Sequence, residues 1–150
     1  MTGKVPPLLQ VALIAAAVLA AQWLLFGWSR PAVPALLVGA ALALIGSLVP
    51  LLATERFVRA GTTVDPRDPT RSEALVTTGI YRFTRNPMYL GFLCWLLALA
   101  VVLHSWLGLL GGLLFFERMQ RSQIPAEEAA LARRFGDAYQ DYCRRVRRWC

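Results

Sequence analysis

The sequence predicts an all-α membrane protein with four transmembrane helices, the last two paired as a hairpin, followed by a C-terminal amphipathic cytoplasmic helix. Of its 150 residues, 57% are hydrophobic, which exceeds the roughly 45–50% of soluble domains. The hydrophobic residues form long uncharged runs rather than the short patterns of a soluble core. The 16 basic residues, which give a net charge of +7, lie outside those runs. This separation excludes most soluble folds and argues against a nucleic-acid partner, and the length fits one domain.

Two uncharged runs, at 8–28 and 32–53, predict the first two transmembrane helices. Each run reaches roughly 30 Å as a helix, which matches the hydrocarbon core of a bilayer. The alternative for the first run is a cleaved signal peptide. We favour a retained helix because the run is longer than the 7–15 apolar residues that are usual in a signal peptide.

A third uncharged run, at 88–116, predicts two further helices. As one helix it would reach roughly 43 Å, which is too long to cross a bilayer without strong tilt. The run is polar only near its middle, at His104 and Ser105. We therefore expect a tight turn there, with helices at 87–103 and 106–120.

The distribution of arginine predicts the orientation in the membrane. Six arginines lie in the loop 54–86 and eight in the segment 117–150, whereas the link after the first helix has only Arg30. Basic segments close to transmembrane helices stay on the cytoplasmic side. Four helices place both arginine-rich segments, together with Lys4, on that side, whereas three would place the second segment outside. We therefore expect an integral protein of a bacterial inner membrane with both termini in the cytoplasm.

The cysteines and the single histidine do not predict a metal site. Cys94, Cys143 and Cys150 fit no zinc-binding spacing, and His104 lies at the far turn. Cys94 falls within a transmembrane helix, where cysteine serves as a small apolar residue. The other two lie in the presumed reducing cytoplasm, so we expect no disulfide.

The loop 54–86 ends in glycine, aromatic and arginine residues at the entrance to the third helix. Asn86 and Pro87 have an ordinary structural explanation, because asparagine often caps a helix and proline often occupies its first turn. That explanation does not account for the other side chains at this entrance, which are Tyr81, Arg82, Arg85 and Tyr89.

After the last transmembrane helix, Pro125 predicts the start of a separate helix at 125–149. Glu127 and Glu128 then lie in its first turn, where carboxylates complement the helix dipole. Hydrophobic residues recur every three or four positions on one face, with the arginines largely elsewhere. Such a helix suits an anionic inner leaflet or the end of the bundle. Gly136 weakens it by roughly 1 kcal/mol relative to alanine and marks a close approach or a kink.

Four short blocks follow one another in the C-terminal half of the chain. Leu-Val-Thr-Thr-Gly-Ile-Tyr occupies 75–81, Arg-Asn-Pro-Met-Tyr-Leu-Gly occupies 85–91, Glu-Glu-Ala-Ala-Leu occupies 127–131 and Phe-Gly-Asp-Ala-Tyr-Gln-Asp-Tyr occupies 135–142. In their order and hairpin-sized gap they resemble the integral-membrane methyltransferases of the isoprenylcysteine carboxyl methyltransferase type, a group that is also similar to phospholipid N-methyltransferases. The resemblance covers roughly residues 61–149.

The chain departs from this family at one position. The family's second block reads Arg-His-Pro-x-Tyr-x-Gly, and Asn86 stands where histidine is frequent. Asparagine donates and accepts hydrogen bonds but does not titrate near neutral pH. A positioning role therefore stays open to Asn86, whereas proton transfer does not.

The resemblance implies S-adenosyl-L-methionine as the methyl donor, bound at the cytoplasmic face. Arg85 or Asn86 would hold its carboxylate, and Glu127 or Glu128 would accept hydrogen bonds from its ammonium group or ribose. Two tyrosines would present ring faces to the sulfonium or the adenine. The implied cofactor-binding residues are Gly79, Tyr81, Arg85, Asn86, Pro87, Tyr89, Gly91, Glu127, Glu128 and Leu131.

The implied acceptor is a hydrophobic small molecule or a lipid that enters from the bilayer. An ionised carboxylate acceptor needs a cation for orientation, and Arg118 and Arg121 lie at the membrane boundary. An amine acceptor needs a base, for which Glu117 and Glu128 are candidates. The catalytic candidates are therefore Glu128, Arg118 and Arg121. Anchoring at the membrane surface is the competing explanation for the two arginines.

Two other functions fit the same pattern of helices. One is a non-catalytic four-helix membrane scaffold, and the other is a membrane reductase of similar helical architecture. Gly39 and Gly46 form a small-residue face that allows close helix packing, either within the chain or between chains. The oligomeric state and the identity of the acceptor stay open.

Overall fold

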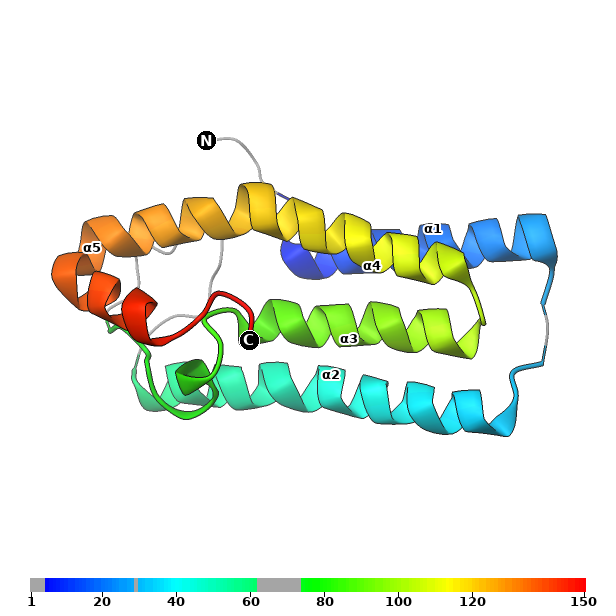
Figure 1. Ribbon diagram of the computed structural model, residues 1–150, viewed down its shortest axis with the longest axis horizontal. Coiled ribbons are helices and arrows are strands. Elements are labelled where there is room, and N and C mark those ends of the chain that lie inside the picture. Colours follow the sequence, from blue (N-terminus) through cyan, green and yellow to red (C-terminus); the bar gives the residue numbers. More distant parts are fainter. Residues whose placement is uncertain (1–4, 29, 62–73) are drawn as a thin grey trace.

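The structure, a computed structural model, describes residues 5–28, 30–61 and 74–150, so Lys4 and two arginines of the loop lie outside the described part. Every regular element within these ranges is helical (Figure 1), which confirms the all-α prediction. The helices are α1 (Pro7–Phe26), α2 (Val33–Arg59), the 3₁₀ turn η2 (Gly79–Arg82), α3 (Pro87–Val102), α4 (Trp106–Arg118), the π-helical turn η3 (Met119–Gln123) and α5 (Ile124–Arg145).

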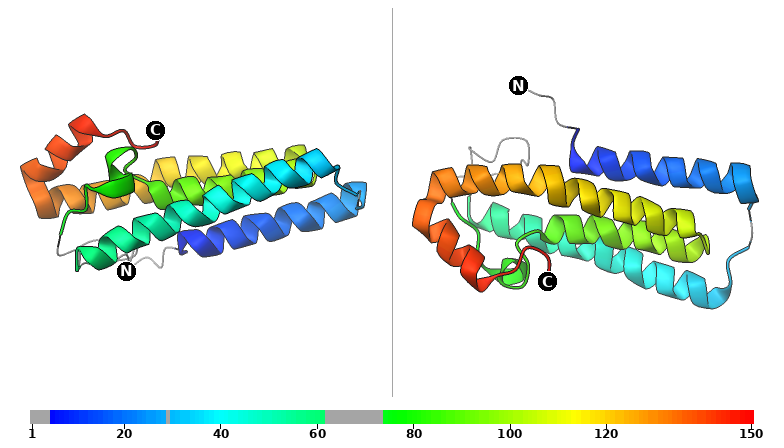
Figure 2. Two further views of the ribbon diagram at one scale, coloured as in Figure 1. Left: turned by 90° about the horizontal axis from the view of Figure 1, so that it is seen from below. Right: turned by 45° about the horizontal axis from the view of Figure 1, so that its top comes forward.

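Helices α1 to α4 lie side by side as an up-and-down bundle (Figures 1 and 2). Helix α3 is central, because it packs against α2 on one side and against α4 and α1 on the other. The end of α2, the start of α3 and the end of α4 therefore share one end of the bundle. The turn η2 and the second half of α5 lie at this same end (Figure 1).

Glycines bring α2 and α3 into close contact. A Cβ atom added at Gly46 would lie 2.8 Å from the backbone oxygen of Gly91 and 2.5 Å from the ring of Trp95. A Cβ atom added at Gly91 would lie 2.5 Å from the ring of Pro50, which is inside α2. Gly39 faces Val102 in the same way. The predicted small-residue face thus packs within the chain.

Helices α1 and α2 are long and apolar enough to cross a bilayer. Only 22% and 17% of their most hydrophobic windows is buried inside the protein, so both helices present apolar side chains outward, which the core helices of soluble proteins do not. Helix α3 has 16 residues and α4 has 13. The predicted turn between them is confirmed, since His104 has a φ of 48° and Ser105 Oγ accepts a hydrogen bond from the Leu107 N–H at 3.2 Å.

The predicted helix is present as α5, which begins at Ile124, one residue before Pro125, but the expectation that it is separate from α4 is wrong. Helices α4 and α5 are continuous through η3, as the yellow-to-orange helix of Figure 1 shows. Proline has no N–H to donate to the carbonyl four residues earlier, and its ring crowds that turn. The wider π-helical turn just before Pro125 accommodates this defect, so the helix continues. Such turns are frequent at functional sites.

The prediction that the last helix continues to residue 149 is also wrong. At Gly136 the backbone has a φ of 51°, and an added Cβ atom would meet nothing within 4 Å. This glycine therefore marks a kink rather than a close approach, and the chain turns back toward α3 (Figure 2). The helix ends at Arg145, and Val146 is extended with φ −126° and ψ 131°. Hydrogen bonds to the start of α3 replace those of a continued helix.

The apolar face of the kinked part of α5 covers the end of the bundle. Tyr139, Tyr142 and Val146 are buried together, with Leu75 and Leu131 packed against them. Of the two roles considered for an amphipathic helix here, the structure supports the capping of the bundle. We call the assembly of η2, the kinked part of α5 and the segment 146–149 the cap.

Candidate functional site

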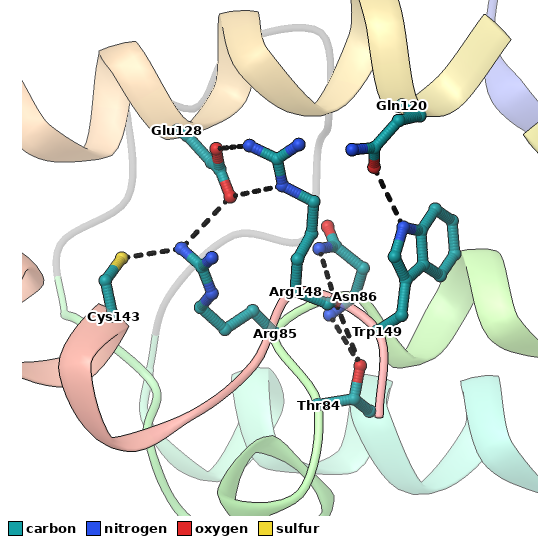
Figure 3. Close-up of polar contacts among 8 residues, drawn as sticks. All are labelled: Thr84, Arg85, Asn86, Gln120, Glu128, Cys143, Arg148 and Trp149. Atoms are coloured by element: carbon teal, nitrogen blue, oxygen red, sulfur yellow. Dashed lines mark hydrogen bonds and ion pairs between the residues drawn. The ribbon is translucent and has the colours of Figure 1, made fainter. Parts of the chain in front are cut away.

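The candidate site lies where the cap meets the first turn of α3. The segment 146–149 crosses this point and is held by hydrogen bonds (Figure 3). The Arg85 N–H donates to the carbonyl oxygen of Arg147 at 3.0 Å. The carbonyl oxygen of Arg148 accepts from Asn86 Nδ2 at 2.9 Å and from Thr84 Oγ1 at 3.3 Å. Asn86 is the N-cap residue of α3 and Pro87 follows it in the first turn, as predicted. The Asn86 side chain makes no capping hydrogen bond, however, and binds the backbone of a distant segment instead.

Glu128 lies between two guanidinium groups. Its Oε1 accepts from Arg85 Nη1 at 3.0 Å and from Arg148 Nε at 3.1 Å, and its Oε2 accepts from Arg148 Nη2 (Figure 3). The hydrogen bond to Glu128 raises the pKa of Arg148 and outweighs the opposing effect of burial. Two arginines and one glutamate give the cluster a net charge of +1. We call these three residues the ionic cluster.

The side chain of Arg85 makes one further hydrogen bond, to Cys143, and has one buried donor atom without a partner among the described residues. Its Nη1 donates to Cys143 Sγ at 2.6 Å, and its side chain is only 15% exposed. Its Nε is buried and has no hydrogen-bond partner among the described residues. A buried donor without a partner costs roughly 1–3 kcal/mol, so this atom is suited to an acceptor oxygen supplied by a ligand.

The side chain of Glu127 has different hydrogen-bond partners from the side chain of Glu128. Its Oε1 accepts from Tyr89 Oη at 2.5 Å and from Gln123 Nε2 at 2.6 Å. Tyr89 and Gln123 are both almost completely buried. The two glutamates therefore serve two separate polar groups, one at the start of α3 and one at the ionic cluster.

Tyr81, which lies in η2, is held by contacts with α5 and with α2. Its carbonyl oxygen accepts from Tyr142 Oη at 2.8 Å, and its ring packs edge-on against Phe57 with the ring centres 5.4 Å apart. Burial, and then the proximity of Tyr142 and Glu127, raises the pKa of Tyr81 above its ordinary value. Its hydroxyl group therefore stays neutral at physiological pH.

Four of the predicted cofactor-binding residues have clear structural roles. Gly79 has a φ of 62°, and the side chain of Arg56 lies where a Cβ atom would be. Pro87 is buried at the start of α3. Gly91 forms the contact with α2, and Leu131 packs in the cap. These residues shape the site without contributing a charged group.

The two predicted catalytic arginines do not join the ionic cluster. Arg118 Nε donates to Oε1 of Gln10, a buried residue of α1, at 2.6 Å. The Arg121 side chain is 80% exposed and pairs with Glu117 on the same helix face. Glu128 pairs instead with Arg85 and Arg148.

Sequence reasoning missed Arg148, Gln123 and Cys143 as members of the site. Arg148 was grouped with the arginines of a continuous amphipathic helix, because nothing in its local sequence indicates that the helix ends before it. Trp149 packs against the hydrophobic core, and its Nε1 donates to Gln120 Oε1 at 2.9 Å. Pro125, which lies two residues after η3, is the one local signal that could have drawn attention to Gln123.

Within the described ranges, no group of three or more histidine, cysteine, aspartate or glutamate residues could hold a metal ion. The charged groups that do converge are arginines and carboxylates. They are suited to a small ligand that carries both charges.

Comparisons with known proteins identify the family of the chain. The family model described as phospholipid methyltransferase matches residues 34–138. A probable protein-S-isoprenylcysteine O-methyltransferase of Oryza sativa subsp. indica is 33% identical over 109 residues, which cover 73% of this chain and 57% of that protein. The protein-S-isoprenylcysteine O-methyltransferase of Schizosaccharomyces pombe is 36% identical over 76 residues, which cover 51% of this chain and 32% of that protein.

A shorter relative matches part of the chain. An uncharacterized protein of Haemophilus influenzae is 42% identical over 62 residues, which cover 41% of this chain and 98% of that protein. No solved structure matches the chain significantly. The chain spans a little over half the length of the rice relative. Since the family model covers most of the chain, including α3, η3 and both glutamates, the protein belongs to the phospholipid methyltransferase family.

Proposed function

We propose that the protein transfers the methyl group of S-adenosyl-L-methionine to a hydrophobic or lipid-like acceptor at the cytoplasmic face of the membrane. The observation that carries the proposal is the ionic cluster of Arg85, Glu128 and Arg148 at the entrance of α3, in a chain of this family. Family membership supports methyl transfer, and the cluster supplies both charges that the amino acid part of this cofactor requires.

The residues of the site fit the cofactor chemically. The Nε of Arg85, which is buried without a partner among the described residues, would donate to the carboxylate of the cofactor. Glu127 and Glu128 would offer oxygens to its ammonium group or ribose hydroxyls, and Tyr81 and Tyr89 would offer ring faces to its sulfonium or adenine. When bound, the cofactor supplies an electrophilic methyl group on a sulfonium centre.

The protein's own contribution is to position the reactants and to exclude water. Glu128 already accepts hydrogen bonds from two guanidinium groups, which makes it better suited to hold a ligand than to remove a proton. Asn86 holds the segment 146–149 against the site. The ring of Tyr89 packs in one buried apolar cluster with Leu96, Phe115 and Met119, which fixes its position at the start of α3.

Of the two acceptor classes considered, an ionised carboxylate requires less catalytic assistance from these residues than an amine does. It requires a cation for orientation and no base, and relatives of this chain are named as isoprenylcysteine O-methyltransferases. Arg118, at the end of α4, and Arg121, in η3, are our candidates for that orientation. The exposed arginines of α5 would contact the anionic lipids of the inner leaflet.

We further propose that α1 to α4 are four transmembrane helices with the cap in the cytoplasm. This arrangement places the site where a soluble cofactor meets a membrane-bound acceptor. An impermeant maleimide tests it: in intact cells it should label a His104→Cys variant and not Cys150, which is exposed at the cap. Labelling of Cys150 from outside, located by mass spectrometry, would reverse the orientation.

Binding of the cofactor tests the enzymatic proposal directly. The protein, purified in detergent, should bind S-adenosyl-L-methionine in a calorimetric titration and should not bind a nicotinamide cofactor. It should then transfer a labelled methyl group to a compound in a membrane lipid extract or to an isoprenylated cysteine. Folded protein that binds no S-adenosyl-L-methionine would contradict the proposal, and binding of the nicotinamide cofactor alone would indicate a reductase.

A further inference from the structure

The segment 146–149 is fixed on both sides of Arg148. On one side, Val146 is buried in the cap. On the other, the indole of Trp149 donates to Gln120 of η3 and packs on Phe116 with the ring centres 4.9 Å apart. The carbonyl oxygen of Arg148 itself accepts two hydrogen bonds from the start of α3. Its backbone is therefore held by three separate elements.

The side chain of Arg148 binds Glu128 with two atoms at once. Its Nε and Nη2 reach the two different oxygens of the carboxylate, as Figure 3 shows. A two-point contact of this kind fixes the plane of a carboxylate as well as its distance. Both side chains are mostly buried, with 28% and 20% exposed, so the pair is less weakened by solvent than a surface ion pair.

This contact also determines where Arg85 lies. Arg85 binds Glu128 through Nη1 alone, at 3.0 Å. A single contact leaves the carboxylate free to rotate unless its other oxygen is held, and Arg148 holds it. The direction of the unpartnered Nε of Arg85 thus depends on Arg148 through Glu128.

We propose that Arg148 is a positioning residue of the cofactor site, which orients Glu128 and, through it, Arg85, so that the segment 146–149 forms one wall of the site. This inference rests on the proposed function, since it assigns Arg148 to the binding of the same cofactor. The chemistry it predicts is the recognition of a zwitterionic amino acid group. Arg148 touches Glu128 and not the reacting atoms, so it affects affinity for the cofactor more than the methyl transfer itself.

The test compares Arg148→Gln and Arg148→Lys with Arg144→Gln as a matched control. Arg144 lies on the same part of the chain and pairs with exposed Asp141 on the surface. Loss of a charged hydrogen-bonded pair of this kind predicts a roughly tenfold weaker affinity of Arg148→Gln for S-adenosyl-L-methionine. Lysine keeps the charge but loses the two-point contact, so Arg148→Lys should fall between wild type and Arg148→Gln. The control should bind as wild type does.

Two further readouts separate positioning from a general loss of structure. In steady-state assays, Arg148→Gln should raise the KM for the cofactor while leaving the KM for the acceptor unchanged. In a Glu128→Gln background, the same substitution should have little additional effect on affinity, because the two residues act as one unit. Full additivity of the two substitutions would overturn the proposal.

If Arg148→Gln does not fold, a measurement on the wild-type protein still tests the proposal. Hydrogen exchange of the amides of 146–149 should slow when S-adenosyl-L-methionine is added. Unchanged exchange, or a folded Arg148→Gln that binds as tightly as wild type, would overturn the role of Arg148. Failure of the wild-type protein to bind the cofactor would instead overturn the proposed function.

Discussion

The helical bundle and the cap are held together by different kinds of contact. In the bundle, Gly46 and Gly91 bring backbones together, and the polar contact between α2 and α3 is a hydrogen bond from Trp95 to Ser47 at 3.2 Å. In the cap, hydrogen bonds and ion pairs join residues far apart in the sequence, such as Asn86 and Arg148. In lipid, association of helices depends on close packing because apolar burial offers no driving force. Outside the lipid, hydrogen bonds and ion pairs between polar groups can form a binding site for a ligand.

This difference predicts that substitutions in the two regions have separable effects. Those in the bundle should change the stability of the whole protein. Those in the cap should change the affinity for the cofactor while the helices remain formed. Four experiments test the separation, beginning with the largest expected effect.

The largest effect should come from Gly46→Ala in the bundle. The added Cβ atom would lie 2.8 Å from the backbone oxygen of Gly91, which cannot move without separating α2 from α3. Overpacking of this kind costs about 1–3 kcal/mol. Thermal unfolding in detergent, followed by circular dichroism, measures it.

Gly112→Ala is the matched control for Gly46→Ala. It lies in α4 and an added Cβ atom would meet nothing within 4 Å, so alanine should stabilise the helix by up to about 1 kcal/mol. Equal melting temperatures for the two variants would show that the contact between α2 and α3 is looser than described.

A smaller effect is expected from Asn86→Ala in the cap. The substitution removes the donor to the Arg148 carbonyl oxygen, while Thr84 still donates to the same atom. We expect a loss of about 1 kcal/mol in the binding of S-adenosyl-L-methionine, with helix content unchanged. Asn86→His, which introduces the residue frequent in the family, keeps a donor and should retain more affinity. If Asn86→Ala lowers the melting temperature as much as Gly46→Ala, the two regions are not separable.

The cap should also be more sensitive to alkaline pH than the bundle. Burial raises the pKa of Tyr81 and of Tyr142 above the ordinary value near 10. The unfolded chain therefore loses these protons near pH 10 while the folded cap keeps them, so the free energy of unfolding should fall as the pH rises above about 10. Below about pH 9 both states are neutral and these tyrosines should cause no change.

Tyr142→Phe is the variant that sharpens the pH experiment. It removes one of the three phenols of the cap whose pKa is raised, those of Tyr81, Tyr139 and Tyr142, so the melting temperature should fall less steeply between neutral and strongly alkaline pH than in wild type. It also removes the hydrogen bond to the Tyr81 carbonyl oxygen and should lower stability by about 1 kcal/mol at neutral pH. An unchanged alkaline slope would show that Tyr142 does not cause the loss.

The smallest effects should come from the arginines at the boundary between the two regions. Arg118→Gln breaks the contact with the buried Gln10 of α1 and should cost about 1 kcal/mol of stability. Arg121 is 80% exposed and pairs with Glu117 on the surface of its own helix, so Arg121→Gln should change stability by less than about 0.5 kcal/mol. The reverse order in thermal unfolding would contradict the position of α1 against α4.

Much of the fold could be predicted from local sequence. Long uncharged runs indicate helices, and His104 with Ser105 in the middle of one run indicates a turn, because an apolar helix of that length has no place for a polar pair. The site was predicted in part, since Arg85, Asn86 and Glu128 were identified by their spacing and by family resemblance. Whether these residues bind the cofactor stays a prediction.

The tertiary structure alone decided how the site is closed. Pro125 favours a helix start by its local chemistry, and only the π-helical turn η3 allows the helix to continue through it. The kink at Gly136 then sets the direction in which α5 returns. Arg148 lies 20 positions from Glu128 and 62 from Asn86, and its contacts depend on that direction. The hydrophobic pattern along the chain determines where helices form. A contact between charged groups far apart in the sequence depends on the angle between two helices, and no local sequence pattern determines that angle.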